Sequence, residues 1–290
     1  MAKTIGNPGS WLAQVFAGAG HHVSESTASL GGHGTEAGEI VVREITLDDL
    51  RDALRRGAAD FAAFRTDVLM LCLIYPFAGL CLAWIAFSGG QIALIFPLAA
   101  GFALIGPVAA VGFYELSRRR EAGQKASWGD AFGFLSSPSL GPILVLGVYL
   151  FAVFVAWMIV AWWIWRLTLG PEPPVSVAGF AGDVLTTGAG WAMIVLGIGA
   201  GFLFAAAVLA MSVVAFPLLL DRNVGLPAAV ATSVEVARKN PRTVAAWGAI
   251  VAASLALGAI PALLGLVVVL PVLGHATWHL YRRAVEPQRR

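Results

Sequence analysis

Long apolar runs without a charged side chain constrain this chain more than any other feature of its sequence. Each is close to the roughly 20 residues that a helix needs to cross a hydrocarbon core about 30 Å thick. Only 12% of the residues are charged, against about 25% in an ordinary soluble domain, so a soluble fold could not cover this apolar surface. The sequence therefore predicts an all-α, polytopic membrane helix bundle. The four clearest runs are 68–87, 92–114, 142–165 and 191–220.

The last apolar stretch, 244–278, is too long for one straight span. At about 1.5 Å per residue it would extend about 50 Å. The sequence G-A-I-P at 258–261 supplies a break near its middle. We therefore predict two spans here, 244–258 and 260–280, and six transmembrane helices in all. A re-entrant hairpin, which enters the membrane and leaves on the same side, is the competing interpretation.

The basic residues lie almost entirely on one side of this topology. Eighteen of the nineteen Lys and Arg residues fall before the first span, at 115–141, at 221–243 or after the last span, and the opposite side holds only Arg166. Since cytoplasmic loops carry the excess of Lys and Arg, we expect a bacterial inner-membrane protein with both termini in the cytoplasm. The aromatic residues expected as anchors at the membrane interfaces are Trp162, Trp163, Trp165, Trp278 and Tyr281.

Three cytoplasmic segments combine apolar residues at helical spacing with charged residues between them, which is typical of amphipathic helices at a membrane interface. Thr46 with Asp49, and Ser127 with Asp130, fit capping-box-like starts for the first two. The third has Pro227 at the expected first helical position. The three segments are 46–64, 127–135 and 226–239.

These segments suggest a three-fold internal repeat, in which one interfacial helix is followed by two spans. Gly123 and Gly225 correspond, as do Pro138 and Pro241, at offsets of 102 and 103 residues. Repeats of this kind are common in membrane proteins. The alternative is that any connector between spans tends to look amphipathic. The predicted units are 46–114, 127–220 and 226–281.

Ionisable side chains are almost absent from the predicted spans. Asp67, Glu115, Arg166 and Asp221 lie at span ends, where water and snorkelling remove most of the cost of a charge. A proton-coupled transporter normally needs a buried carboxylate, and the spans offer no good candidate.

His275 and His279 are the exception, because their i, i+4 spacing places both rings on one helix face. A metal or haem site would need ligands from other helices, and no other predicted span carries a His. We expect these two histidines to hydrogen-bond to headgroups or to a neighbouring helix, and we expect no metal and no cofactor. As a metal site they are weak candidates only.

Cysteine, proline and glycine give weaker signals. Cys72 and Cys81 point in opposite directions on one helix, so we expect two unpaired apolar side chains. Gly197 and Gly201 form a G-x-x-x-G pair, which allows close helix contact. The prolines inside spans are expected to kink their helices, either tolerated by neighbours or lining a substrate site. They are Pro76, Pro107 and Pro271.

The domain organisation follows from composition. We expect a flexible arm at 1–40, rich in Gly, Ser, Thr and His, a transmembrane domain at 41–285 and a short tail at 286–290. The sequence contains no P-loop, dinucleotide fingerprint, H-E-x-x-H or G-x-S-x-G motif. It also lacks a basic patch large enough for nucleic acid.

Four stretches together resemble a bacterial family of predicted integral membrane proteins, classed as a domain of unknown function and frequent in alphaproteobacteria. They are V-R-E-I at 42–45, P-F-A-G-L at 76–80, Y-E-L-S-R-R at 114–119 and G-H-A-T-W-H-L-Y-R at 274–282. The resemblance covers about 40–285. Some members have carried a cytochrome c oxidase label, but a catalytic oxidase subunit needs several intramembrane histidines, and this chain offers two on one helix.

The sequence therefore favours a non-catalytic accessory, assembly or scaffold protein of the inner membrane. Its partners are expected to be membrane lipid and another membrane protein, with a respiratory complex implied only by the family label. A small-solute transporter or channel is the alternative, motivated by the kinked, glycine-rich spans. An enzyme acting on lipid ranks third, because no acid, base or nucleophile can be named for it.

Overall fold

The computed structural model describes residues 40–287 except 73–76, 78, 82–83, 85–86, 89–90, 173 and 175. The predicted arm at 1–40 lies outside the described residues apart from Ile40, as does much of the predicted first span. Within the described part, the secondary structure is helical except for one isolated antiparallel bridge between Val42 and Val285. The predicted all-α fold class is confirmed.

The elements are listed here in chain order. They are α2 (Leu47–Cys72), η1 (Ile92–Leu94), α4 (Ile95–Phe102), η2 (Ala103–Ile105), α5 (Gly106–Ala109), α6 (Val111–Glu121), η3 (Trp128–Ser136), α7 (Leu140–Thr168), α8 (Val177–Thr186), α9 (Gly188–Ser212), α10 (Ala215–Asp221), α11 (Leu226–Lys239), α12 (Pro241–Ala259) and α13 (Leu266–Ala284).

Three of these stretches are long and apolar enough to cross a membrane. They are Leu140–Thr168, Gly188–Asp221 and Pro241–Ala259, and they correspond to the predicted third, fourth and fifth spans. The predicted sixth span, as α13, carries two histidines and ends in Arg282 and Arg283. The count of six spans is not confirmed within the described residues.

The predicted second span, 92–114, is not one continuous helix. It is divided into η1, α4, η2, α5 and α6, with 3-10 turns at 92–94 and 103–105. Pro97 and Pro107 each lie in the first turn of a short α-helix, where a missing N–H is tolerated. Pro271, in contrast, lies inside α13 without ending it, and Pro76 is outside the described residues.

The three predicted interfacial helices differ from one another. The first is the N-terminal part of α2, which continues without a break to Cys72. The second, η3, is a 3-10 helix rather than an α-helix, which suits its short length. The third, α11, is an amphipathic α-helix.

The predicted start signals are confirmed at all three sites. The Thr46 amide donates to the Asp49 carboxylate at 2.8 Å, and the Asp49 amide donates back to the Thr46 hydroxyl at 3.3 Å. Ser127 and Asp130 form the same reciprocal pair. Pro227 lies in the first two positions of α11.

Gly123 and Gly225, which correspond in the predicted repeat, also share an unusual backbone conformation. Their φ angles are 71° and 77°, in the left-handed region that favours glycine. This local match and the paired capping boxes agree with the repeat. The equivalence of the three whole units stays a prediction.

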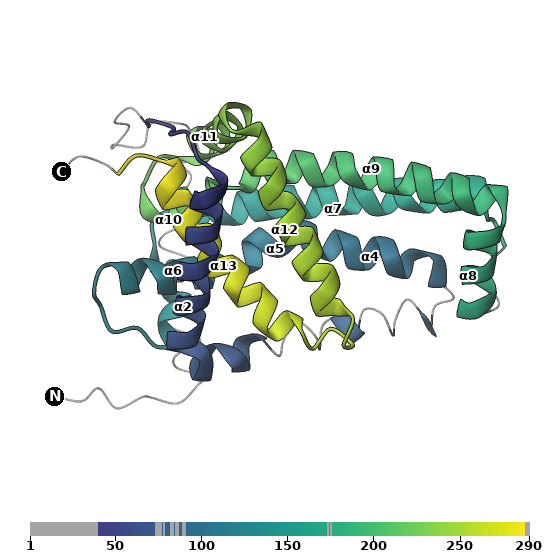
Figure 1. Ribbon diagram of the computed structural model, residues 1–290, viewed down its shortest axis with the longest axis horizontal. Helices are drawn as coiled ribbons and strands as arrows, with labels where there is room; N and C mark the ends of the chain where they lie inside the picture. Colours follow the sequence, from purple (N-terminus) through teal and green to yellow (C-terminus); the bar gives the residue numbers. More distant parts are fainter. Residues whose placement is uncertain are drawn as a thin grey trace.

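The helices are arranged around one long axis. Figure 1 shows α7 and α9 side by side along this axis, with α8 at one end and α2, α6, α10 and α11 gathered at the other. We call the second group, with the last turns of α13, the polar end. Gly201 allows α9 to approach α7 closely, because a Cβ there would lie 3.1 Å from the Trp157 ring, whereas a Cβ at Gly197 would meet nothing within 4 Å.

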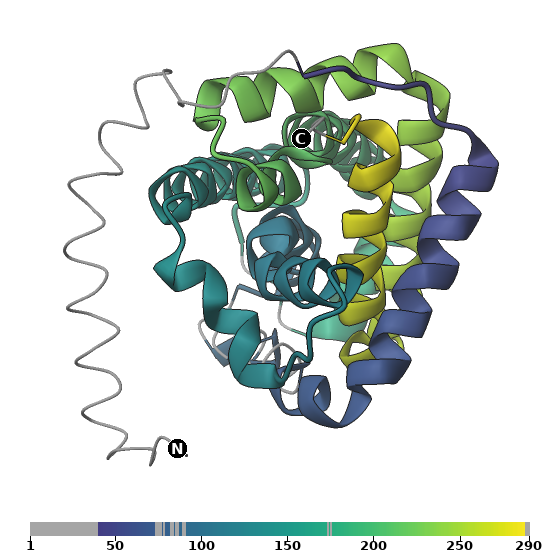
Figure 2. The ribbon, with the colours of Figure 1, turned by 90° about the vertical axis from the view of Figure 1, so that its left-hand side faces the viewer.

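The most extensive helix pair is α2 against α13, which Figure 2 shows running alongside each other. The two backbones approach at Gly57, where an added Cβ would lie 2.6 Å from the Ala276 amide nitrogen. The buried face of α2 includes Leu50, Ala53 and Phe64. Since a side chain at position 57 has nowhere to go, glycine is required for this contact.

We expect the Gly57→Ala substitution to destabilise the protein by about 1–3 kcal/mol, as overpacking does. In a helix that nothing contacted, the same change would stabilise by up to about 1 kcal/mol, so the sign is diagnostic. Thermal unfolding in mild detergent measures the effect, with Ala58→Ser at an exposed neighbouring position as the control. An unchanged or raised melting temperature for Gly57→Ala would contradict the observed helix crossing.

Candidate functional site

The candidate site is a buried polar cluster at the polar end, centred on Asp60 of α2. Its carboxylate accepts hydrogen bonds from Ser117 (2.5 Å) and Arg120 (2.5 Å) of α6 and from His279 (2.8 Å) of α13. Ser117 also contacts the His275 Nδ1 at 2.8 Å. The Asp60 residue is only 5% exposed, so the cluster joins three helices through a buried charge.

The direction of these hydrogen bonds follows from the proton count. The single hydroxyl hydrogen of Ser117 is donated to Asp60, so the Ser117 oxygen accepts a hydrogen bond from His275 Nδ1–H. His275 is then the neutral tautomer with its proton on Nδ1, and its Nε2 carries a lone pair. The chain runs from His275 through Ser117 to Asp60.

The Nε2 atom of His275, at the end of this series of hydrogen bonds, lies in an apolar environment. The residue is fully buried, and its ring contacts the rings of Phe64 (centroids 6.0 Å apart, stacked) and Phe113 (5.5 Å, tilted). Its Nε2 has no hydrogen-bond partner in the described part of the chain. Because a charge on this ring would be costly among aromatic neighbours, the environment holds His275 neutral.

The Asp60 carboxylate is held in its ionised form. Burial by itself raises the pKa of this carboxyl, but the hydrogen bonds from His279 and Ser117 outweigh it, and the pKa lies below its usual range. Arg120, which is 41% exposed, supplies the opposite charge at the mouth of the cluster. The cluster is thus a paired and hydrogen-bonded charge, the form in which a buried carboxylate is tolerated.

Glu115 corrects one prediction from the sequence. We expected it at a span end in contact with water, but its side chain is only 1% exposed. It accepts hydrogen bonds from Arg118 at 2.8 Å and from Arg119 at 2.7 Å. Arg119 also donates a hydrogen bond to Asp130 at 2.7 Å. These partners replace the water that the sequence analysis assumed.

Trp278 and Tyr281 correct another prediction. They were expected as anchors at the membrane interface, but each is only 1% exposed. The Trp278 Nε1 donates to Glu121 at 2.9 Å, and the Tyr281 hydroxyl donates to Asp221 at 2.6 Å. Acidic residues from neighbouring helices satisfy their polar tips, so the rings can pack inside the protein. Trp165 is also buried, at 7% exposure, so it does not fit the predicted anchor role either, whereas Trp163, which is 50% exposed, remains a suitable anchor.

His275 and His279, the weak metal candidates, hydrogen-bond to neighbouring helices. This agrees with one of the two expectations from the sequence. Among the described residues, no group of three or more His, Cys, Asp or Glu side chains is arranged to hold a metal ion. Cys81 is a free, exposed thiol, and the side chain of Cys72 is outside the described part.

The sequence analysis missed Asp60, Ser117 and Arg120. In the first predicted amphipathic segment, 46–64, Leu47 is 58% exposed. The buried stripe instead runs at i, i+4, i+7 and i+11. A carboxylate between small and aromatic residues on this stripe was the signal that could have revealed the cluster. The stripe consists of Ala53, Gly57, Asp60 and Phe64.

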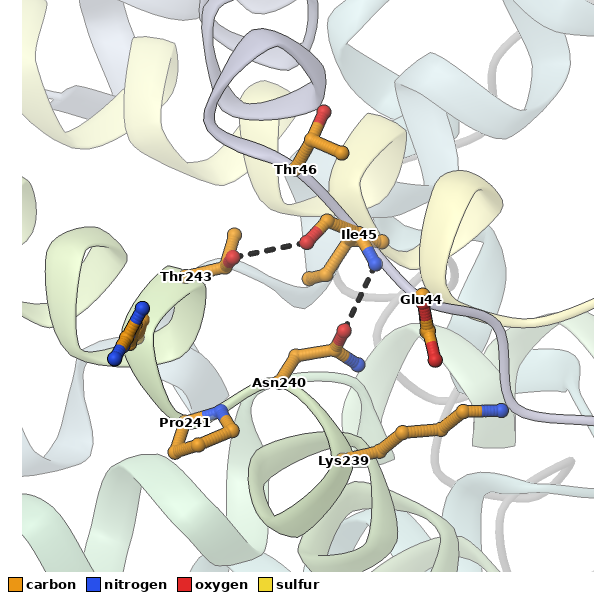
Figure 3. A pocket seen from close by; sticks show the side chains of 8 residues that line it. Glu44, Ile45, Thr46, Lys239, Asn240, Pro241 and Thr243 are labelled. Carbon is orange, nitrogen blue, oxygen red and sulfur yellow. Dashed lines mark hydrogen bonds between the residues drawn. The ribbon is translucent and has the colours of Figure 1, made fainter.

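Two surface hollows accompany the cluster in the described part. One, of about 260 Å³, is shown in Figure 3 and lies where the segment before α2 crosses the junction of α11 and α12. There Asn240 accepts from the Ile45 amide at 2.8 Å, and Thr243 donates to the Ile45 carbonyl at 2.9 Å. The other, of about 230 Å³, is lined by Asp48, Arg51, Asp52 and Arg55. Both are shallow and open.

The cluster joins α2, α6 and α13 through buried hydrogen bonds. Ser117 is fully buried and its hydroxyl proton is committed to Asp60, so it is not available as a nucleophile. Neither surface hollow is lined by a residue of the cluster. The role that the geometry supports is to fix α2, α6 and α13 relative to one another.

Comparison with known proteins agrees with a membrane protein. Residues 95–221, from α4 to α10, match the model of a family described as "Predicted integral membrane protein (DUF2189)". The chain is similar to integral membrane proteins of unknown function. Comparisons with curated proteins and with solved structures found no match. The match supports the resemblance drawn from the sequence at this level, and one of the four motifs behind it, 114–119, lies inside the matched region.

We expect the Asp60→Asn substitution to destabilise the protein by about 2 kcal/mol or more. It leaves Arg120 and His279 facing a neutral amide, and breaking a fully buried ion pair costs about 3–5 kcal/mol; the partial exposure of Arg120 reduces this. The control is Asp48→Asn on the same helix, where an 85% exposed ion pair contributes about 0–1 kcal/mol. Equal melting temperatures for the two variants would show that the cluster does not stabilise the fold.

We also expect the effect of Asp60→Asn on stability to depend on pH. Because the folded pKa of Asp60 lies below the unfolded value of about 3.9, its ionised form adds stability above about pH 4, and this is lost as the pH falls toward the folded pKa. The difference in melting temperature between wild type and Asp60→Asn should therefore shrink between about pH 5 and 3. Asp52 and Asp130 also have lowered pKa values, so only this difference isolates Asp60. A difference that stays constant over the range would argue against an ionised Asp60.

Proposed function

We propose that this chain is a non-enzymatic, non-catalytic membrane protein that acts through helix–helix contacts as an accessory, assembly or scaffold component. The observation that supports the proposal is a difference in chemistry between two parts of the molecule. At the polar end Asp60, Arg120 and His279 are paired with one another, whereas α7 and α9 present broad apolar faces. Exposed apolar side chains on these faces include Val148, Phe151, Ile159, Val195, Ile198, Phe202 and Leu203.

One face of α9 is suited to contact with another helix. Ala192, Gly199 and Ala206 are exposed and recur every seven residues, so they lie on one side of the helix. A Cβ added at Gly199 would meet nothing within 4 Å. Without a hydrophobic driving force between helices in lipid, small residues favour association because they let backbones approach. This stripe is distinct from Gly201, which packs against Trp157 of the same chain.

The proposal includes the inner membrane of a bacterium and cytoplasmic termini, supported by the distribution of Lys and Arg. Exposed basic residues at the polar end, among them Lys125, Arg238 and Arg242, suit anionic lipid headgroups. The identity of the membrane-protein partner is not part of the proposal and is to be found by experiment. The oxidase label of the resembling family makes a respiratory complex one partner to look for.

Co-purification from native membranes in mild detergent tests the proposal. We expect a membrane-protein partner in stoichiometric amount, and Gly199→Leu should reduce its recovery by about tenfold or more, a loss of about 1.4 kcal/mol. Val148→Leu, at a position of α7 that is 69% exposed, is the matched control and should retain the partner. A homogeneous preparation of this chain alone would overturn the proposal.

A small-solute transporter or channel is the second candidate, favoured by the broken helix from η1 to α6. Interrupted helices line substrate sites in many transporters. Asp60 also supplies a buried carboxylate, although it lies on α2 outside the predicted spans. Solute flux in liposomes reconstituted with the purified chain discriminates the two, since a scaffold passes none.

A further inference from the structure

The turn between α12 and α13 has a composition unlike that of a loop in water. Residues 259–265 read A-I-P-A-L-L-G, and no Asp, Glu, Lys or Arg occurs between Arg242 and Arg282. Ile260 is 77% exposed and Leu264 is 60% exposed. In contrast, the last turn of α7 and the connection to α9, which includes α8, carry Arg166, Glu172 and Asp183. An exposed apolar turn of this kind is expected in contact with hydrocarbon.

The turn also stops short of the far end of the bundle. In Figure 1, α12 and α13 run obliquely to α7 and α9, and the turn that joins them lies well before the level of α8. The far end of α7 and α9 carries exposed Trp163 and Trp191, which are typical of a membrane–water interface. The turn therefore lies between this interface and the polar end.

A contact with another segment gives an independent indication of depth. A Cβ added at Gly79 would lie 2.7 Å from the Leu263 side chain, so the turn packs against this glycine. Gly79 falls near the middle of the uncharged run 68–87, the length of which matches one crossing of the bilayer. If that run crosses the membrane, its midpoint and the turn lie near the bilayer centre.

The backbone of the turn can be tolerated in lipid, where unpaired N–H groups are costly. The amides of Ala262, Leu263 and Leu264 donate to the carbonyls of Ile260, Ala259 and Pro261 at 2.9, 3.0 and 3.0 Å. Ala262 and Leu263 have positive φ angles of 49° and 67°, which let the chain reverse within a few residues. An added Cβ at Gly265 would lie 2.7 Å from the Gly258 Cα, so the two helices meet closely at the turn.

We infer that α12 and α13 form a re-entrant hairpin, which enters the hydrocarbon from the polar end, turns at 260–265 inside the bilayer and returns to the same side. The surface formed by Ile260 and Leu264 binds lipid acyl chains near the bilayer centre. The hairpin replaces two predicted spans without changing the side on which the C-terminus lies. The inference does not depend on the proposed function.

Cysteine accessibility in the full chain tests this topology. In a background with Cys72→Ala and Cys81→Ala, Leu264→Cys should not react with a membrane-impermeant maleimide added to either side, but should react after unfolding in detergent. Glu172→Cys should react from one side, and Arg238→Cys, in the exposed part of α11, from the other. Reaction of Leu264→Cys from either side in intact membranes would overturn the hairpin.

Fluorescence quenching measures the depth of the turn in the bilayer, which accessibility to maleimide does not show. A fluorophore on Leu264→Cys should be quenched at least about twofold more strongly by a lipid with a nitroxide near the acyl-chain end than by one labelled at the headgroup. Ile260→Cys, at a second exposed position of the turn, should behave in the same way. Stronger quenching from the headgroup would place the turn at an interface and contradict the inference.

Discussion

The packing of α2 on α13 is the contact on which the rest of the polar end depends. One helix comes early in the described chain and the other ends it, so their contact closes the fold. It needs a glycine at position 57, where the α2 backbone approaches Ala276. It also needs a buried charge to be satisfied, because Asp60 lies on the same face three residues later. Close contact and full pairing of that charge therefore require each other.

The third helix in this arrangement, α6, supplies most of the compensation. Ser117 and Arg120 donate to Asp60 from α6, and Glu115 on the same helix is paired with its own neighbouring arginines. A buried carboxylate without such partners would be strongly destabilising. This helix, α6, is the last element of the predicted second span, 92–114, which the structure divides into η1, α4, η2, α5 and α6.

Pairing at the polar end limits what the molecule can do there. The buried acids and His279 are engaged in contacts within the chain, and the two described hollows are shallow. The outer surfaces are apolar along α7 and α9 and carry exposed basic residues on α11. The pair α7 and α9 extends further along the long axis than the pair α12 and α13 (Figure 1).

The sequence by itself determined the class of the molecule. Uncharged runs of about 20 residues predict membrane helices because backbone groups in lipid must be paired within the segment. Local start signals such as Thr46 with Asp49 and Ser127 with Asp130 were also predictable, since a capping box involves residues only three apart. These features depend on composition or on neighbours in sequence.

Only the tertiary structure decided which polar residues are buried together. Asp60, Ser117 and His275 are separated by 57 and 158 residues, so no local pattern relates them. Trp278 and Tyr281 looked like interfacial anchors because amphipathic rings near a helix end fit that position. They lie inside the protein because Glu121 and Asp221, on other helices, accept their hydrogen bonds. Burial of a polar side chain depends on partners brought by distant segments, and those are set by how the helices pack.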